Sequence, residues 1–110
     1  DLFATQPSRL RIGIKKKAGN AIIIKPNQAG TISKTLETVE IAKKAKFATI
    51  VSHRSCETND DFISDLAVGI ESPLIKCGIY GNERKAKLDR LLTIWNKLNK
   101  PEMSKVNAFI

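Results

Sequence analysis

The sequence predicts an α/β fold in which parallel strands alternate with helices. Three short apolar runs recur at a spacing of roughly 26 residues, and a segment with helical periodicity follows each of them. The first run, AIII, is continuously apolar, which is typical of a strand buried on both faces in a parallel sheet. With 110 residues, 42% of them hydrophobic and 27% charged, the chain corresponds to one small globular domain or to part of a larger one.

Caps and apolar periodicity assign the elements in chain order. Pro7 suits the first position of a helix on which Leu10 and Ile14 share one face. Asp60 and Asp61 open a later helix, where acidic side chains complement the helix dipole. We expect helices at 7–18, 31–46, 60–70 and 83–99, strands at 20–25, 47–52 and 73–79, and a turn at 26–30.

Three of the predicted helices carry apolar stripes that we expect to be buried. Because each of these helices follows a strand, they are expected to cover a sheet of parallel strands. The stripes are Ile32, Leu36, Val39 and Ala42 in 31–46, Phe62, Leu66 and Ile70 in 60–70, and Leu88, Leu91, Leu92, Trp95 and Leu98 in 83–99.

Composition narrows the class of protein. The net charge of +8 favours an anionic partner, such as a nucleic acid, an acidic surface or a phosphorylated metabolite, although solvated surface lysines would give the same excess. Aromatic residues make up 5% of the chain, which argues against a protein that stacks single-stranded bases. No apolar run approaches the roughly 20 residues of a membrane span, and no leader-like segment opens the chain. Cys56 and Cys77 form no CxxC pair, which argues against a zinc site and for reduced thiols in a cytoplasmic protein.

Each predicted strand ends on a cationic or nucleophilic side chain. The first ends at Lys25, the second at Ser52 followed by His53, Arg54 and Ser55, and the third at Lys76. A single lysine in this position is more often a solvated cap, and a lone histidine is more often structural. Functional groups of parallel α/β folds collect at the carboxyl ends of strands, so the coincidence at three ends favours an anion site. Arginine and a hydroxyl suit a phosphate in particular.

Several long motifs resemble enolase, the phosphopyruvate hydratase family of glycolysis. SHRSCETNDDFISDLAVG is similar to the family's SHRSGETEDTFIADLAVG, and IIIKPNQAGT is similar to LLLKVNQIGT. LIKCGIYGNERKAKLDRLLTI resembles the last barrel strand and helix of that family. The resemblance implies that residues 1–110 are the C-terminal segment of the enolase barrel domain, with the last three βα units of a TIM-like barrel.

The resemblance also implies roles for the residues at the strand ends. Lys25 matches the lysine that removes the proton beside the substrate carboxylate, and Lys76 matches the lysine that holds this carboxylate. Arg54 and Ser55 match the phosphate-binding pair, and His53 matches a histidine that reaches into the same pocket. The implied substrate and product are 2-phosphoglycerate and phosphoenolpyruvate. A lysine acts as a base only in its neutral form, which neighbouring positive charges favour.

The resemblance places other parts of the enzyme outside this chain. The family's acidic Mg²⁺ ligands, its general-acid glutamate and its N-terminal domain are expected before Asp1, so this chain carries no assigned metal ligand and is expected to be inactive alone. It is expected to work with that missing N-terminal part, and a homo-oligomer is left open. Cys56 stands where the family has glycine and Asn59 where it has glutamate. The Cys56 difference is expected to alter the backbone there, because glycine often marks a conformation that other residues avoid. An alternative is a non-catalytic protein, built on an enolase remnant, that binds anions or nucleic acid. The positive charge favours it, but the retention of Lys25, His53, Arg54, Ser55 and Lys76 together argues against it, and nucleic acid is not the expected partner.

Overall fold

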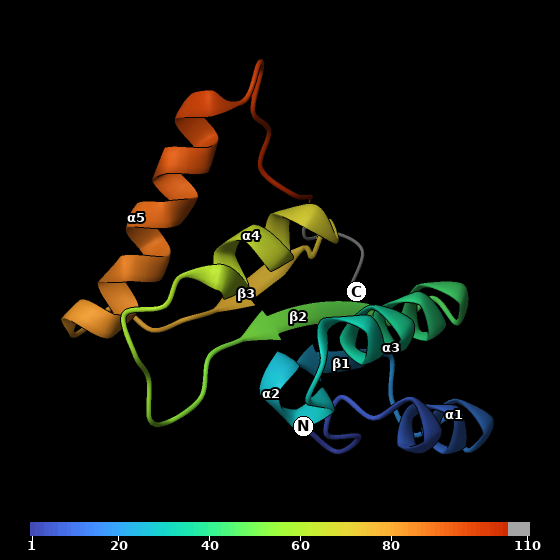
Figure 1. Cartoon of the computed structure of the whole chain (residues 1–110). Coiled ribbons are helices and arrows are strands. Elements are labelled where there is room, and N and C mark those ends of the chain that lie inside the picture. Colours follow the sequence, from blue (N-terminus) through green and yellow to red (C-terminus); the bar gives the residue numbers. More distant parts are fainter. Residues whose placement is uncertain (106–110) are drawn as a thin grey trace.

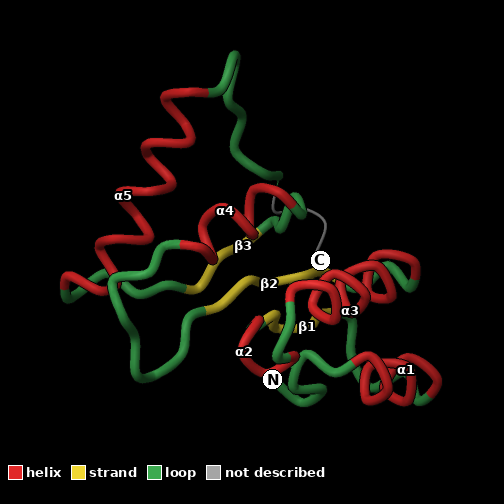
Figure 2. The backbone as a smooth tube through the Cα atoms, in the orientation of Figure 1, coloured by secondary structure: helices red, strands yellow, loops and turns green. Residues whose placement is uncertain are grey.

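The structure, a computed structural model, describes residues 1–105 as a small parallel sheet with helices packed against it. The strands β1 (Ala21–Ile24), β2 (Ala48–Ser52) and β3 (Leu74–Lys76) lie in the order β1-β2-β3, and both neighbouring pairs are parallel. The parallel α/β fold predicted from the sequence is therefore confirmed (Figures 1 and 2). The helices are α1 (Pro7–Lys15), α2 (Pro26–Ala29), α3 (Ile32–Lys44), α4 (Phe62–Gly69) and α5 (Asn82–Lys97).

One face of the sheet is covered by three of the helices. The buried core joins Ile22, Ile24 and Val51 of the strands to apolar side chains of α1, α3 and α4, among them Leu10, Val39 and Leu66. The ring of Phe3 packs edge-on against Phe47, with ring centroids 6.2 Å apart. Helix α5 packs on α4 and extends away from the sheet, as Figure 1 shows on its left side.

The expectation that the first strand is buried on both faces is wrong within the described chain. In β1, Ile22 and Ile24 are buried, whereas the alternate residues Ala21 and Ile23 are half-buried. Leu74 of β3 is exposed. Successive side chains of a strand point to opposite faces, so the helices cover one face and leave the other partly open.

The buried face of α3 differs from the predicted stripe. Val39 and Ala42 are buried as expected, but Ile32 and Leu36 are exposed, and Thr35 and Thr38 are buried in their place. Threonine tolerates this burial because each hydroxyl donates to a carbonyl one turn earlier, at 2.8 Å and 2.9 Å.

The predicted apolar stripe of the last helix is only partly buried, and Leu88 and Leu91 are its half-buried members. Leu92, Trp95 and Leu98 are exposed, and the one buried residue of α5 is Lys87. The helix touches the rest of the described chain mainly through α4, so most of its circumference faces solvent. Of the stripe in α4, Leu66 and Ile70 are buried and Phe62 is exposed.

Element boundaries differ from the predicted ones for a local reason. Helices α1, α3 and α4 end before the predicted residues, because Lys17, Lys46 and Glu71 adopt positive φ angles of 52°, 58° and 53°, which take the chain out of the helix. The predicted turn at 26–30 is the one-turn helix α2, which Gly30 ends with a φ of 91°. Within residues 1–105, no helix is both long and apolar enough to span a membrane.

Candidate functional site at the carboxyl ends of the strands

The strand register aligns the residues that end the three strands. Ser52 pairs with Lys76 across β2 and β3, and Ile24 pairs with Val51 across β1 and β2, so Lys25 falls opposite Ser52. Residues in one row of a parallel sheet point to the same face. Lys25, Ser52 and Lys76 therefore form one row, on the face that the helices leave partly open.

Lys25 is held by an acidic partner that the sequence did not suggest. Its amine lies 2.7 Å from a carboxylate oxygen of Asp1, and its side chain is only 13% exposed. The Asp1 carboxylate thus lies at the same end of the sheet as Lys25.

Thr5 is a buried hydroxyl that fixes the backbone at Lys25. It accepts a hydrogen bond from the Lys25 N–H at 2.9 Å and lies 3.0 Å from the Gln28 side-chain oxygen. The side-chain amide of Gln6 donates to the backbone carbonyl of Gln28 at 2.6 Å. The hydroxyl of Thr38 donates to the backbone carbonyl of Thr5 at 3.1 Å. The segment before α1 therefore ties the end of β1 to α2 and α3.

His53 is anchored to the third strand. Its backbone N–H and its ring Nδ1 both lie within hydrogen-bond distance of the Lys76 carbonyl, at 2.9 Å and 2.7 Å. Because a carbonyl oxygen only accepts, Nδ1 must carry a proton. The contact therefore fixes the ring against β3 and leaves Nε2 for other partners.

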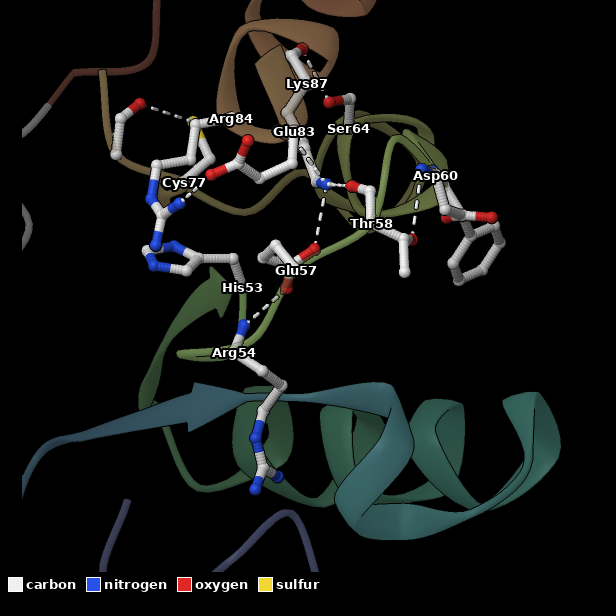
Figure 3. Close-up of polar contacts among 12 residues, drawn as sticks. His53, Arg54, Glu57, Thr58, Asp60, Ser64, Cys77, Glu83, Arg84 and Lys87 are labelled. Carbon is white, nitrogen blue, oxygen red and sulfur yellow. Dashed lines mark hydrogen bonds and ion pairs between the residues drawn. The ribbon is translucent and has the colours of Figure 1, made fainter. Parts of the chain in front are cut away.

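Arg54 and Ser55 lie exposed on the loop that follows His53. The Arg54 guanidinium reaches back toward α2, where Nη1 lies 3.4 Å from the Asn27 side-chain oxygen, two residues after Lys25. Figure 3 shows the Arg54 side chain directed toward the ribbon of β1 and α2. The structure thus directs the guanidinium toward the segment that follows Lys25.

The two cysteines have different environments. Both are free thiols, Cys56 exposed and Cys77 buried. Burial raises the pKa of the Cys77 thiol, and this effect outweighs the opposing charge of Lys87. Cys56 is not among the described non-glycine residues with positive φ, so its backbone conformation does not require glycine.

Sequence reasoning missed the groups that support this site from a distance. Lys87 of α5 is 1% exposed, and its amine contacts Glu57 of the loop after His53 at 2.8 Å. The sequence did contain a signal that Lys87 faces the protein. It precedes Leu91 of the predicted apolar stripe by four residues and so lies on the same side of the helix. Asp1, Thr5 and Glu57 stand in no local pattern that marks them.

The site is cationic and offers no metal centre of its own. Within residues 1–105, no three His, Cys, Asp or Glu side chains cluster in a way that could hold a metal ion. Lysine and arginine side chains instead gather where the strands end, which suits a ligand with more than one negative group.

A parallel α/β sheet with cationic residues at the carboxyl ends of its strands is typical of α/β proteins, both barrels and open sheets, that bind a ligand at that end. The sequence family described as Enolase, C-terminal TIM barrel domain, matches residues 1–108. The chain belongs to the enolase family, which confirms the resemblance seen in its motifs.

Named enolases of several organisms are similar to most of this chain. The enolase of Picrophilus torridus is 51% identical over 98 residues, which are 89% of this chain and 24% of that protein. The enolase of Bdellovibrio bacteriovorus is 54% identical over 95 residues (86% and 22%), and that of Methanosphaera stadtmanae is 48% identical over 104 residues (94% and 25%). The chain thus spans about a quarter of the length of the curated relatives it matches.

Proposed function

We propose that this chain is part of an enolase that reversibly dehydrates 2-phosphoglycerate to phosphoenolpyruvate. The observation that carries the proposal is the row of Lys25 and Lys76 at the ends of β1 and β3, with Arg54 beside it, in a chain of the enolase family. The substrate has a carboxylate and a phosphate on the same carbon. Lys76 in the row and Arg54 beside it offer a separate cation for each of these groups.

The proposed division of labour follows the chemistry of the substrate. Lys76 binds the carboxylate, and Arg54 with Ser55 binds the phosphate. Lys25 accepts the proton from C2, the hydroxyl group leaves C3, and a double bond forms between the two carbons. An acid that donates a proton to the leaving hydroxyl is required, and we expect it, as a glutamate, among residues before Asp1. His53 contributes its ring at the same end of the sheet.

The Asp1 contact adds a condition to the role of Lys25. The Lys25 amine lies 2.7 Å from the Asp1 carboxylate and must leave this partner before it can reach the C2 proton. We propose that substrate binding separates the two groups.

Mg²⁺ belongs to the proposal for the longer protein. The described part of the chain does not fit a metal site, because its acidic side chains form no cluster of ligands. The expected carboxylate ligands lie before Asp1. We also propose a cytoplasmic location and assembly with the N-terminal part of the enzyme.

The positive charge favours a second candidate, a non-catalytic anion-binding role. An assay of phosphoenolpyruvate formation separates the two candidates. The complete polypeptide that contains this segment is expected to turn over 2-phosphoglycerate with Mg²⁺, whereas the 110-residue chain alone is expected to show no turnover above a Lys25→Ala control. Phosphate binding without turnover by the complete polypeptide would favour the second candidate.

A further inference from the structure

Lys87 is a buried cation for which the proposed reaction has no use. Its side chain is 1% exposed, which is rare for lysine unless every donor is paired. The amine donates to the carbonyls of Thr58 and Glu83 at 2.6 Å and 2.7 Å and lies 2.8 Å from the Glu57 carboxylate. These three partners use all three donors of the ammonium group, as Figure 3 shows.

Glu57 divides its carboxylate between α5 and the loop that carries Arg54. One oxygen pairs with Lys87, and the other accepts a hydrogen bond from the Arg54 backbone N–H at 2.6 Å. Partial burial would raise the pKa of Glu57, but the hydrogen bonds from Lys87 and Arg54 and the charges of Lys87 and His53 outweigh it and lower the pKa. Glu57 is therefore an anion that links helix α5 to the backbone of Arg54.

The loop between β2 and α4 is held partly by this link and partly by other contacts, among them the one from Arg84 to the Ser55 carbonyl at 3.5 Å. It has no regular secondary structure, and the Arg54 side chain makes one long contact, at 3.4 Å. The guanidinium thus remains available to a ligand, while the backbone beneath it is fixed by Glu57.

We propose that Glu57 and Lys87 are a positioning pair that aims Arg54 and Ser55 at the substrate phosphate. This inference rests on the proposed function of the site, and neither residue touches the substrate. The pair has two effects. Glu57 fixes the Arg54 N–H, and Lys87 neutralises a carboxylate that would otherwise repel a phosphate nearby.

The second effect gives the pair a signature that a purely structural contact lacks. Lys87→Met leaves the Glu57 charge partly buried and unpaired, so it should weaken binding of 2-phosphoglycerate by about tenfold or more. Glu57→Gln keeps an acceptor for the Arg54 N–H and should weaken binding less. The double variant removes both charges and should bind more tightly than Lys87→Met alone.

Calorimetric titration of the complete polypeptide with 2-phosphoglycerate measures these differences. Lys85→Met is the matched control, because Lys85 lies on the same helix with its side chain 66% exposed and pairs with Asp89. The control should bind as the wild type does. Unchanged affinity in Lys87→Met, or a double variant weaker than Lys87→Met, would overturn the inference.

Hydrogen exchange at the Arg54 amide tests the positioning without any ligand. Glu57→Ala removes the acceptor and should speed this exchange by about tenfold or more, since the lost bond is to a charged group. Glu57→Gln should speed it less, and Lys85→Met should leave it unchanged. If the complete polypeptide fails to bind 2-phosphoglycerate, the proposed function fails, yet accelerated exchange still supports the positioning. Unchanged exchange in Glu57→Ala overturns the positioning even if turnover is observed.

Discussion

The backbone N–H of Arg54 is held by Glu57 at 2.6 Å, whereas its guanidinium makes one contact with Asn27, at 3.4 Å. A side chain with this freedom can exchange its protein contact for a ligand without disturbing the loop. This combination of a fixed backbone and an available charge suits a residue that binds substrate.

Arg54→Ala in the complete polypeptide should weaken substrate binding. Loss of a charge-assisted phosphate contact corresponds to about 1.5–3 kcal/mol, or roughly a ten- to hundredfold rise in KM. Steady-state kinetics measures the change, and Arg54→Lys should recover part of it, because lysine keeps the charge but not the fork of donors. A KM and a kcat that both match the wild type would show that the role is misassigned.

The two thiols should differ in reactivity. Cys56 is exposed, whereas Cys77 is buried and its pKa is raised, so Cys56 should be alkylated first under native conditions. Mass spectrometry after alkylation should find two modified cysteines once the chain is unfolded. A species two hydrogens lighter, with neither cysteine modified, would instead reveal a disulfide.

At the scale of the residue, the sequence indicated the side chains at the strand ends, but it did not indicate the residues that form hydrogen bonds and ion pairs with them. Lys25, His53, Arg54 and Lys76 stand out because each follows an apolar run, and the structure brings their backbones to one end of the sheet. Thr5 contacts Lys25 across 20 residues of sequence. No local pattern encodes a contact of that range, so the supporting groups emerge only from the fold.

The loop after β2 and helix α5 are joined by the ion pair of Glu57 and Lys87, so the attachment between these elements should depend on pH. The folded-state pKa of Glu57 is lowered, so its stabilisation is present above the unfolded pKa, about 4.3 for a glutamate, and is lost as pH falls through the folded pKa. Denaturant unfolding of the full chain should show Glu57→Gln less stable than the wild type at pH 7. The free energies of unfolding of the wild type and of Glu57→Gln should become equal in acid. If acidification lowered both by the same amount, the result would contradict this account.

Helical periodicity predicted where the helices are, but it predicted only part of the side that each of them buries. In α3 the sequence favoured Ile32 and Leu36, yet Thr35 and Thr38 are buried, because helix hydrogen bonds satisfy their hydroxyls. In α5, Leu92, Trp95 and Leu98 of the apolar stripe are exposed while Lys87 is buried. Apolar spacing cannot detect a polar side chain whose partners lie on another element.

The whole molecule is a sheet with one face covered and the other partly open. The open face carries the row of Ile23, Ile50 and Leu74 beside the row of Lys25, Ser52 and Lys76. The parallel order followed from the alternation of strands and helices, because consecutive parallel strands need a crossover between them. The sequence did not predict the partly open face, because the continuously apolar first run suggested a strand buried on both faces.

The central claim is that Lys25 removes the C2 proton of 2-phosphoglycerate, and isotope exchange tests it most directly. In deuterated water, the complete polypeptide with Mg²⁺ should exchange the C2 hydrogen of 2-phosphoglycerate for deuterium. Lys25→Ala should abolish this exchange and still bind 2-phosphoglycerate, because Arg54 and Lys76 remain. Exchange at the wild-type rate in Lys25→Ala would contradict the account.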